Sequence, residues 1–117
     1  MKTVGNIKDI KGKVMDSDVV KNTEMKVLIG PEQGWKDHVM RMMEVDVDGY
    51  TPKHSHPWPH INLMIEGKGV LMIDGVDHEM EAGSYAYVPA DSLHQFRNTG
   101  NTKFKFMCVV PEKGHTY

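Results

Sequence analysis

Short apolar runs, many alternating with polar residues, dominate the chain from residue 39 to residue 110. Residues that form turns, namely Gly, Asn, Asp and Pro, separate these runs at close intervals. The region offers no convincing helical spacing of apolar residues. The pattern predicts strands at Met25 to Ile29, Val39 to Val47, Ile61 to Ile65, Val70 to Ile73, Val76 to Met80, Tyr85 to Val88, His94 to Asn98 and Lys103 to Val110.

Asp74-Gly75 lies between two of these apolar runs and is the strongest hairpin signal in the chain. Many short strands joined by tight turns are typical of a sandwich or a barrel. The residues before Met25 are either irregular or pair at a sheet edge. We therefore predict an all-β protein with a single domain over residues 1–117, the usual size for one domain.

Composition narrows the partners that we expect. Fourteen basic and sixteen acidic residues give a net charge of −2, without long blocks of one sign, so neither nucleic acid nor an anionic membrane is an expected partner. No apolar run approaches the roughly 18 residues of a membrane span, and residues 1–6 do not resemble a secretory signal, so we expect a cytoplasmic protein. Because Cys108 is the single cysteine, a metal site would depend on histidine and carboxylate.

Three of the seven histidines fall within seven residues, at His54, His56 and His60. Residues i and i+2 of an extended segment project to the same side, so His54 and His56 can face one point. Pro57 and Pro59 favour a turn, after which His60 would open the next strand and face the same point. The heptapeptide alone also fits a polar surface loop.

A second pattern begins at Gly83, and fifteen residues separate it from Gly67. Its spacing is G-x5-P-x-D-x2-H-x3-N, given by Gly83, Pro89, Asp91, His94 and Asn98. Together, residues 49–69 and 83–98 resemble the two motifs of the cupin superfamily, G-x5-H-x-H-x3,4-E-x6-G and G-x5-P-x-G-x2-H-x3-N. The resemblance implies a cupin-type antiparallel β-barrel, also described as a double-stranded β-helix or jelly roll. It also implies that the metal ligands are His54, His56, His60 and His94.

The chain departs from these motifs at three positions. Gly49 precedes His54 by four residues rather than five, and Asp91 replaces the usual glycine. His60 replaces the usual glutamate, which resembles a subgroup of small single-domain bacterial cupins whose four-histidine site is associated with manganese. The resemblance therefore implies one divalent transition metal per chain with manganese favoured, whereas donor chemistry alone leaves iron, nickel, copper, cobalt and zinc open.

Four neutral imidazoles would leave the full +2 charge on the metal and, on an octahedral ion, two open positions. Such a centre favours anionic or enolisable oxygen ligands. We expect either a metal-dependent enzyme acting on a small oxygen-rich or enolisable molecule, or a non-catalytic module that binds or senses a small molecule. For the enzyme, dioxygenase-type redox chemistry is favoured over isomerisation, because few titratable groups are expected in the barrel. No catalytic residue is assigned.

Strand alternation predicts which side chains surround the metal. The inward set after His60 is Asn62, Met64 and Glu66. The aromatic residues of the last two strands are either barrel core or substrate contacts. Cys108 is either a small buried apolar residue or a thiol near the metal that is open to oxidation. The candidate pocket comprises Trp58, Asn62, Phe96, Phe104, Phe106 and Cys108.

The opposite face of the strand after His60 carries Ile61, Leu63 and Ile65, which point out of the barrel. Apolar residues on an outer face need a cover, either the N-terminal segment or a second subunit. We expect a homodimer. Tyr85 and Tyr87 share one face of a neighbouring strand and are expected to pack in the core or to donate a proton in the pocket.

Overall fold

The computed structural model describes residues 3–115 of the chain, and strands form most of this range. The helical segments within it are three single 3-10 turns, η1 (Ile7–Asp9), η2 (Pro31–Gln33) and η3 (Glu112–Gly114). The strands in the same range are β1 (Lys13–Met15), β2 (Lys21–Ile29), β3 (His38–Tyr50), β4 (His60–Glu66), β5 (Lys68–Ile73), β6 (Val76–Glu81), β7 (Tyr85–Val88), β8 (His94–Asn98) and β9 (Phe104–Pro111). Each predicted strand coincides with one of these, so the all-β prediction is confirmed.

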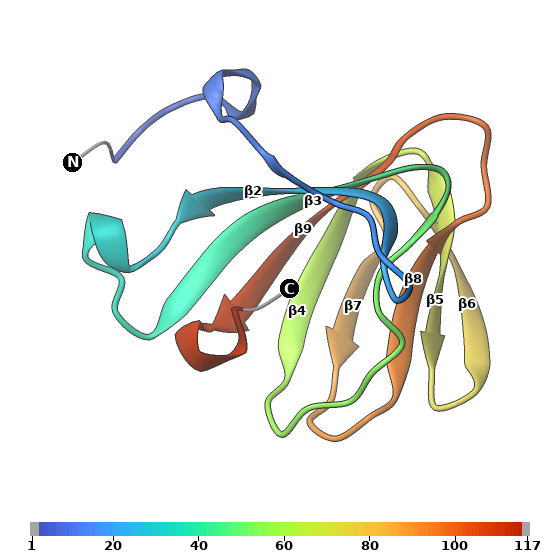
Figure 1. The fold of residues 1–117 in the computed structure, drawn as a ribbon. Coiled ribbons are helices and arrows are strands. Elements are labelled where there is room, and N and C mark those ends of the chain that lie inside the picture. The colour runs from blue at the N-terminus through green and yellow to red at the C-terminus, as the bar shows by residue number, and fades with distance from the viewer. Residues whose placement is uncertain (1–2, 116–117) are drawn as a thin grey trace.

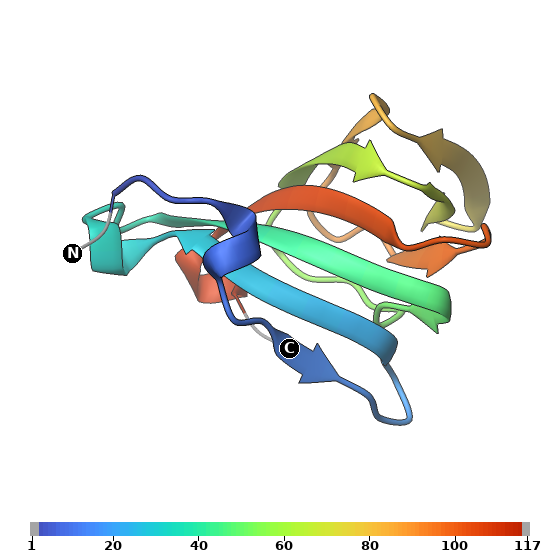
Figure 2. The ribbon, with the colours of Figure 1, turned by 90° about the horizontal axis from the view of Figure 1, so that it is seen from above.

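All strand pairs are antiparallel, in the order β6-β5-β8-β3-β9-β4-β7. β2 adds to β3, and β1 adds to β2. Figures 1 and 2 show that this sheet curls into a nearly closed barrel, with β1, β2, β3 and β9 side by side along one wall. β1 and the first residues of β2 lay outside the predicted strands, and they extend the outer edge of that wall.

Hairpin β5-β6 turns at Asp74-Gly75 as predicted. Both residues have left-handed backbone conformations, with φ of 49° and 85°, which matches the twist of the flanking strands. Asp91, which replaces the motif glycine, adopts φ of 67°. Aspartate tolerates this region better than most residues, so the replacement preserves a left-handed turn just before His94.

The interior of the barrel is filled by alternate residues of each strand. β8 and β9 bury every second residue, beginning with His94 and Phe104 respectively, which confirms the predicted inward faces. Phe96 stacks on Phe106 with ring centroids 4.1 Å apart. The central cluster has the composition expected of a packed core and includes Met43, Val45, Met64, Leu71, Val88, Phe96, Phe104 and Phe106.

Three residues lie on the other side of their strands from the prediction. Glu66 is exposed and forms an ion pair with Lys105 at 3.5 Å, because the β4-β9 register shifts between Met64 and Glu66. Tyr85 and Tyr87 share a face as expected, but that face is the outer one, where they are 83% and 60% exposed. Neither tyrosine packs in the core or reaches the pocket.

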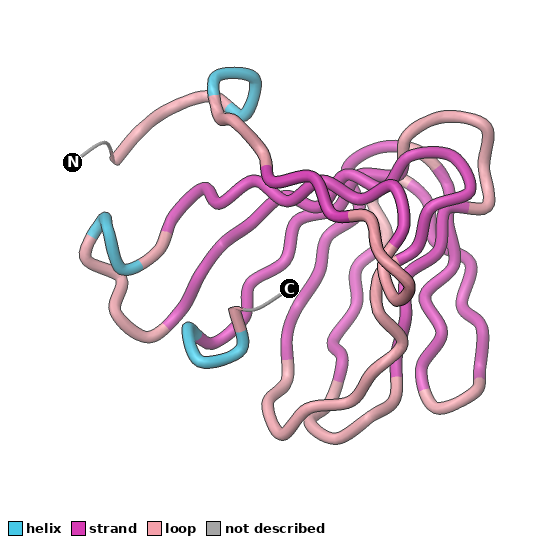
Figure 3. The backbone as a smooth tube through the Cα atoms, in the orientation of Figure 1, coloured by secondary structure: helices cyan, strands magenta, loops and turns pink. Residues whose placement is uncertain are grey.

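Loops meet at one end of the barrel (Figure 3), where the long β3-β4 connection lies near the β7-β8 connection.

In the range 3–115 no helix is both long enough and apolar enough to cross a membrane.

Gly67 in the β4-β5 turn and Gly75 in the β5-β6 turn have similar backbone angles but differ in how closely other atoms pack around them. Gly67 has φ of 82°, and a Cβ there would overlap the carbonyl oxygen of Lys103; Gly75 has φ of 85° and open space around it. Gly75→Ala should cost about 1 kcal/mol through left-handed strain alone. Gly67→Ala should cost about 2 kcal/mol more because the backbone must also move. Urea unfolding of the two variants measures this difference, and equal costs would contradict it.

Candidate metal centre

Two backbone hydrogen bonds join the motif segments to each other. The His54 amide donates to the His94 carbonyl oxygen at 3.1 Å, and the His94 amide donates to the His54 carbonyl oxygen at 2.9 Å. Beside this bridge, the Asp91 amide donates to the His56 carbonyl oxygen at 2.7 Å. Segments separated by forty residues therefore run antiparallel across the end of the barrel, and their histidine side chains project to the same side.

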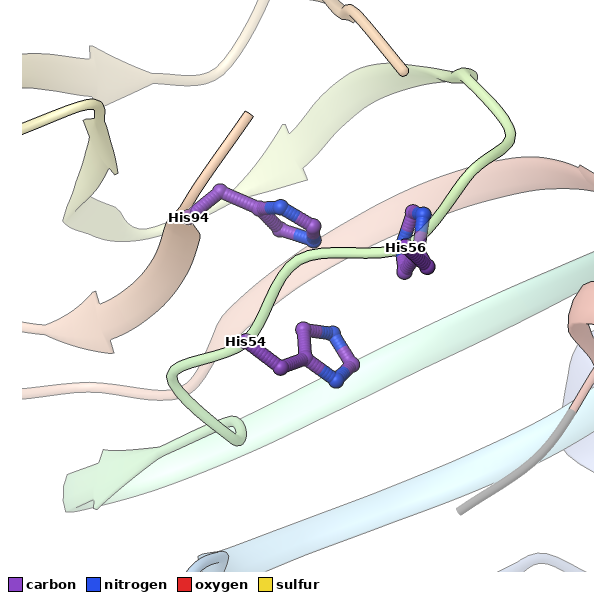
Figure 4. Close-up of side chains that lie close together, drawn as sticks. All are labelled: His54, His56 and His94. Atoms are coloured by element: carbon purple, nitrogen blue, oxygen red, sulfur yellow. The ribbon is translucent and has the colours of Figure 1, made fainter. Parts of the chain in front are cut away.

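The rings of His54, His56 and His94 face one another (Figure 4), and one nitrogen from each lies within 4.8 Å of the other two. His60, the first residue of β4, lies at the edge of this group. Its Nε2 is 3.2 Å from Nε2 of His94, and its ring centroid is 5.5 Å from that of His56. The structure thus gathers all four predicted ligands, with three of them forming the tightest group.

Three of the rings are oriented by hydrogen bonds from their outer nitrogens. Nδ1 of His56 lies 2.7 Å from the Trp58 carbonyl oxygen, and Nδ1 of His94 lies 2.9 Å from that of Ser92. Nδ1 of His60 lies 2.7 Å from Oδ1 of Asn62, whose amide group donates to the Met107 carbonyl oxygen. Since these oxygens only accept, each Nδ1 carries the proton and each Nε2 keeps a lone pair.

These tautomers place two lone pairs against each other. The Nε2 atoms of His60 and His94 are only 3.2 Å apart, and neither has a proton to share in the neutral state. A cation between such nitrogens removes the repulsion. The donor set therefore fits a divalent transition metal, because imidazole is a common ligand of such metals and its outer nitrogen is usually held by an oxygen acceptor, as here.

Burial favours the neutral form of His54, His60 and His94. It lowers the pKa of His54 from 6.5 to about 4, assisted by the neighbouring His94 and His56 rings and by Arg41. It lowers the pKa of His60 to about 3, against an opposing hydrogen bond with Asn62. Burial also lowers the pKa of His94, although the Ser92 carbonyl acts in the opposite direction. Neutral imidazole is the form that binds metal, so the rings are available without first losing a proton.

A cavity of about 220 Å³ opens beside the histidines. Four predicted pocket residues line it, namely Trp58, Phe96, Phe106 and Cys108. The other two lie behind this wall. Asn62 is buried and orients His60, and Phe104 is fully buried in the core with its ring centroid 5.4 Å from that of Phe106.

Trp58 is held between His56 and the C-terminal turn. Its ring stacks on His56 at a centroid distance of 5.0 Å and an interplanar angle of 10°. A Cβ at Gly114 would overlap the indole Nε1, so η3 lies directly against the tryptophan. These contacts are those of a packing anchor in the cavity wall.

Cys108 lies in the cavity wall and is 2% exposed. Its Sγ is 4.0 Å from Nη2 of Arg41. Burial raises the pKa of the thiol, and the lowering effects of Arg41 and Asn62 are smaller. Because oxidation proceeds through the thiolate, this environment opposes the oxidation hypothesis although it places the sulfur beside the site.

Five further residues line the cavity: Arg41, Met43, Ser55, Val110 and Gly114. Strand alternation indicates Val110, which shares the inward face of the last strand with Phe106 and Cys108, but the other four were not predicted from the sequence. Strand alternation could have found Arg41, since it shares the parity of the buried Val39 and Met43 on β3. For Gly114 there was no signal, because the last turn follows the final predicted strand.

The lowered histidine pKa values give the metal-free protein a specific acid sensitivity. Between pH 6.5 and about 4 the unfolded chain binds more protons than the folded one, so the free energy of unfolding should fall as the pH drops through this window. His60→Gln should flatten the dependence by up to about 1.4 kcal/mol per pH unit. Urea unfolding at several pH values measures it, with His78→Gln on exposed β6 as the matched control. Identical slopes in the two variants would refute the assignment.

Comparison with known proteins adds three relatives. The chain is 37% identical over 65 residues to the dimethylsulfoniopropionate lyase DddW of Ruegeria pomeroyi, covering 56% of this chain and 43% of the lyase. The polyketide cyclase RemF from Streptomyces resistomycificus superposes with a TM-score of 0.86 at 26% identity, over 95% of this chain and 80% of RemF. A predicted oxalate decarboxylase from Thermotoga maritima gives 0.83 at 24% identity, over 93% and 98%, and shows the shared fold.

The chain spans about half the length, or less, of the curated relatives that it matches. A family model described as a cupin domain matches residues 41–110, which include both motif segments and all four clustered histidines. With the antiparallel barrel and these structural neighbours, the match shows that the chain belongs to the cupin family.

Proposed function

We propose that this protein is a metal-dependent enzyme that acts on a small oxygen-rich or enolisable molecule. The observation that carries the proposal is the pair of facing, unprotonated nitrogens of His60 and His94, which lie beside His54 and His56. A bound divalent metal would act as a Lewis acid toward substrate oxygens and, if redox-active, as an electron relay to dioxygen. Manganese is proposed on the family resemblance.

The chain's own residues would bind and enclose the substrate. His54, His56, His60 and His94 would hold the metal at one side of the cavity, and Phe96 and Phe106 would exclude water from it. Among residues 3–115 no Asp or Glu lines this cavity, so no carboxylate is available there as a general acid or base. This composition favours redox chemistry over isomerisation.

The lyase relative favours a second reaction class. Its name describes elimination from a small carboxylate, and the two chains are 37% identical over 65 residues. Elimination would need no oxygen, so turnover that persists without oxygen uptake would favour lyase-type chemistry. Substrate binding without turnover under either condition would favour the non-catalytic binding module.

The test begins with the metal content of untagged protein. Wild type should contain about one divalent metal per chain, and His60→Ala should lose at least about 10-fold in metal affinity because one ligand is removed. His78→Ala, an exposed histidine on β6, is the matched control and should bind metal like wild type. Oxygen uptake and product formation are then followed over diketones, phenols and 2-keto acids. Equal metal binding by all three proteins would contradict the proposed centre.

We also propose that the protein is a homodimer. Ile61, Leu63 and Ile65 of β4 are 51%, 38% and 47% exposed on the outer face. Tyr85 and Tyr87 of the paired strand β7 extend this apolar surface. A continuous apolar patch of this kind is typical of a subunit interface.

Light scattering at micromolar concentration should give about twice the chain mass of 13.3 kDa. Leu63→Glu should shift the protein to monomer, because a charge would be buried at the interface. Val76→Glu changes an exposed apolar residue on β6 and should leave the mass unchanged. A wild-type mass of one chain would exclude the dimer.

A further inference from the structure

Asn62 is a buried polar residue in the wall of the barrel. It lies on β4, opposite Ala86 of β7 on one side and opposite Cys108 of β9 on the other. Only 4% of the residue is exposed. A buried side-chain amide has to satisfy both its oxygen and its amino group, so the groups that face Asn62 decide which way round the amide lies.

The Met107 carbonyl oxygen sets the orientation of this amide. Nδ2 of Asn62 lies 3.4 Å from that oxygen, and Oδ1 lies 2.7 Å from Nδ1 of His60. Because a carbonyl oxygen only accepts, the end of the amide that faces it must be the amino group. Exchanging the two ends would place two oxygens against each other at β9. Asn62 therefore presents its oxygen, an acceptor, to His60.

An acceptor at this position holds the proton of His60 on Nδ1. The other ring nitrogen, Nε2, then carries a lone pair and faces Nε2 of His94 at 3.2 Å. His94 is held in the same tautomer, since its Nδ1 lies 2.9 Å from the Ser92 carbonyl oxygen. Neither of the facing nitrogens can donate, so the two neutral rings cannot form a hydrogen bond with each other.

The competing arrangement differs in the position of one proton. If the proton of His60 moved to Nε2, that nitrogen would donate to Nε2 of His94, which is already within hydrogen-bond distance. The bond would occupy two of the nitrogens that face the cluster. Asn62 makes this arrangement unfavourable, because its Oδ1 and the bare Nδ1 of His60 would then meet as two acceptors at 2.7 Å in a buried place.

We propose that Asn62 is a positioning residue that locks the tautomer of His60, and so prevents a hydrogen bond between His60 and His94 from closing the cluster. Backbone carbonyls orient His56 and His94, whereas a side chain that can be substituted orients His60. That the open cluster then receives a metal rests on the function proposed above. The tautomer of His60 does not.

The first experiment reads the tautomer in metal-free protein. Imidazole nitrogen shifts in NMR distinguish a protonated nitrogen from one with a lone pair, and His60→Gln identifies the signals of His60 by their absence. At pH 8, above the reference histidine pKa of about 6.5, wild-type His60 should have a protonated Nδ1 and a bare Nε2. A protonated Nε2 in wild type would overturn the proposal without any variant of Asn62.

Two substitutions separate the acceptor from the rest of the side chain. Asn62→Leu and Asn62→Asp both lose the donation to Met107, but only Asn62→Asp keeps an acceptor toward His60. Asn62→Leu should therefore move the proton of His60 to Nε2, and Asn62→Asp should keep it on Nδ1. The lock is wrong if the two variants show the same tautomer.

Asn98→Leu is the matched control. Asn98 is also a buried asparagine, 7% exposed, but its amino group donates to the carbonyl oxygens of Val45 and Thr102 rather than serving a histidine. The substitution should lower the stability while leaving the tautomer of His60 unchanged. A tautomer change in Asn98→Leu would assign the effect to loosened packing and overturn the role of Asn62.

Calorimetric titration with manganese gives the second readout. Asn62→Leu should bind about 10- to 100-fold more weakly than wild type although all four histidines remain, the usual cost of losing a group that orients a ligand. Asn62→Asp should bind at least as tightly as wild type, because a carboxylate is a stronger acceptor than an amide. Asn98→Leu should bind like wild type. Unchanged affinity in Asn62→Leu would overturn the lock.

The two readouts separate this inference from the proposed function. Wild type that binds no metal, with the expected tautomers in wild type and both Asn62 variants, would remove the metal enzyme and leave the lock standing. Wild type that binds metal, with the wild-type tautomer retained in Asn62→Leu, would do the reverse.

Discussion

The paired backbone hydrogen bonds between His54 and His94 are the constraint on which this molecule depends. They close a loop of forty residues at a point where neither segment belongs to a long strand, and they hold two imidazoles against each other. Closing this loop costs conformational entropy. The pairing and packing of strands β4 to β7, which lie within the loop, must offset that cost. The histidine cluster therefore forms only when the strands of the barrel have folded.

The same constraint explains the electrostatic character of the site. Burial disfavours protonation of His54, His60 and His94, and oxygen acceptors fix which nitrogen of three of the four rings faces inward. A metal-free site of this kind retains unfavourable lone-pair contacts, so binding and folding favour each other. The outer acceptors, a side-chain amide and two backbone carbonyls, belong to the same segments as the ligands.

Local periodicity was sufficient to predict every strand from β2 to β9, although not β1, and the resemblance of the two motif segments to cupin motifs predicted the gathering of the histidines. The sequence did not predict which face of a strand a residue occupies where that face depends on pairing with neighbouring strands. A register shift turned Glu66 outward, and β7 presents Tyr85 and Tyr87 on the outer face, although their shared parity was predicted correctly. Arg41 was overlooked because a charged residue in a strand is assumed to face water. The turn at Gly114 reaches the cavity from beyond the last predicted strand, so no local pattern could place it there.

One part of the cavity wall, the C-terminal turn at Gly114, lies outside the segment that carries the histidines. The cupin match begins at Arg41 and ends at residue 110, so Gly114 and His115 fall outside it, while both motif segments lie within it. Mutation of the C-terminal turn can therefore reshape what the cavity admits without touching the residues that gather around the cluster. Across evolution, such a division would allow relatives with the same motifs to diverge in the molecules they accept. Substrate differences in this family would then be found at the edges of the conserved segment rather than at its centre.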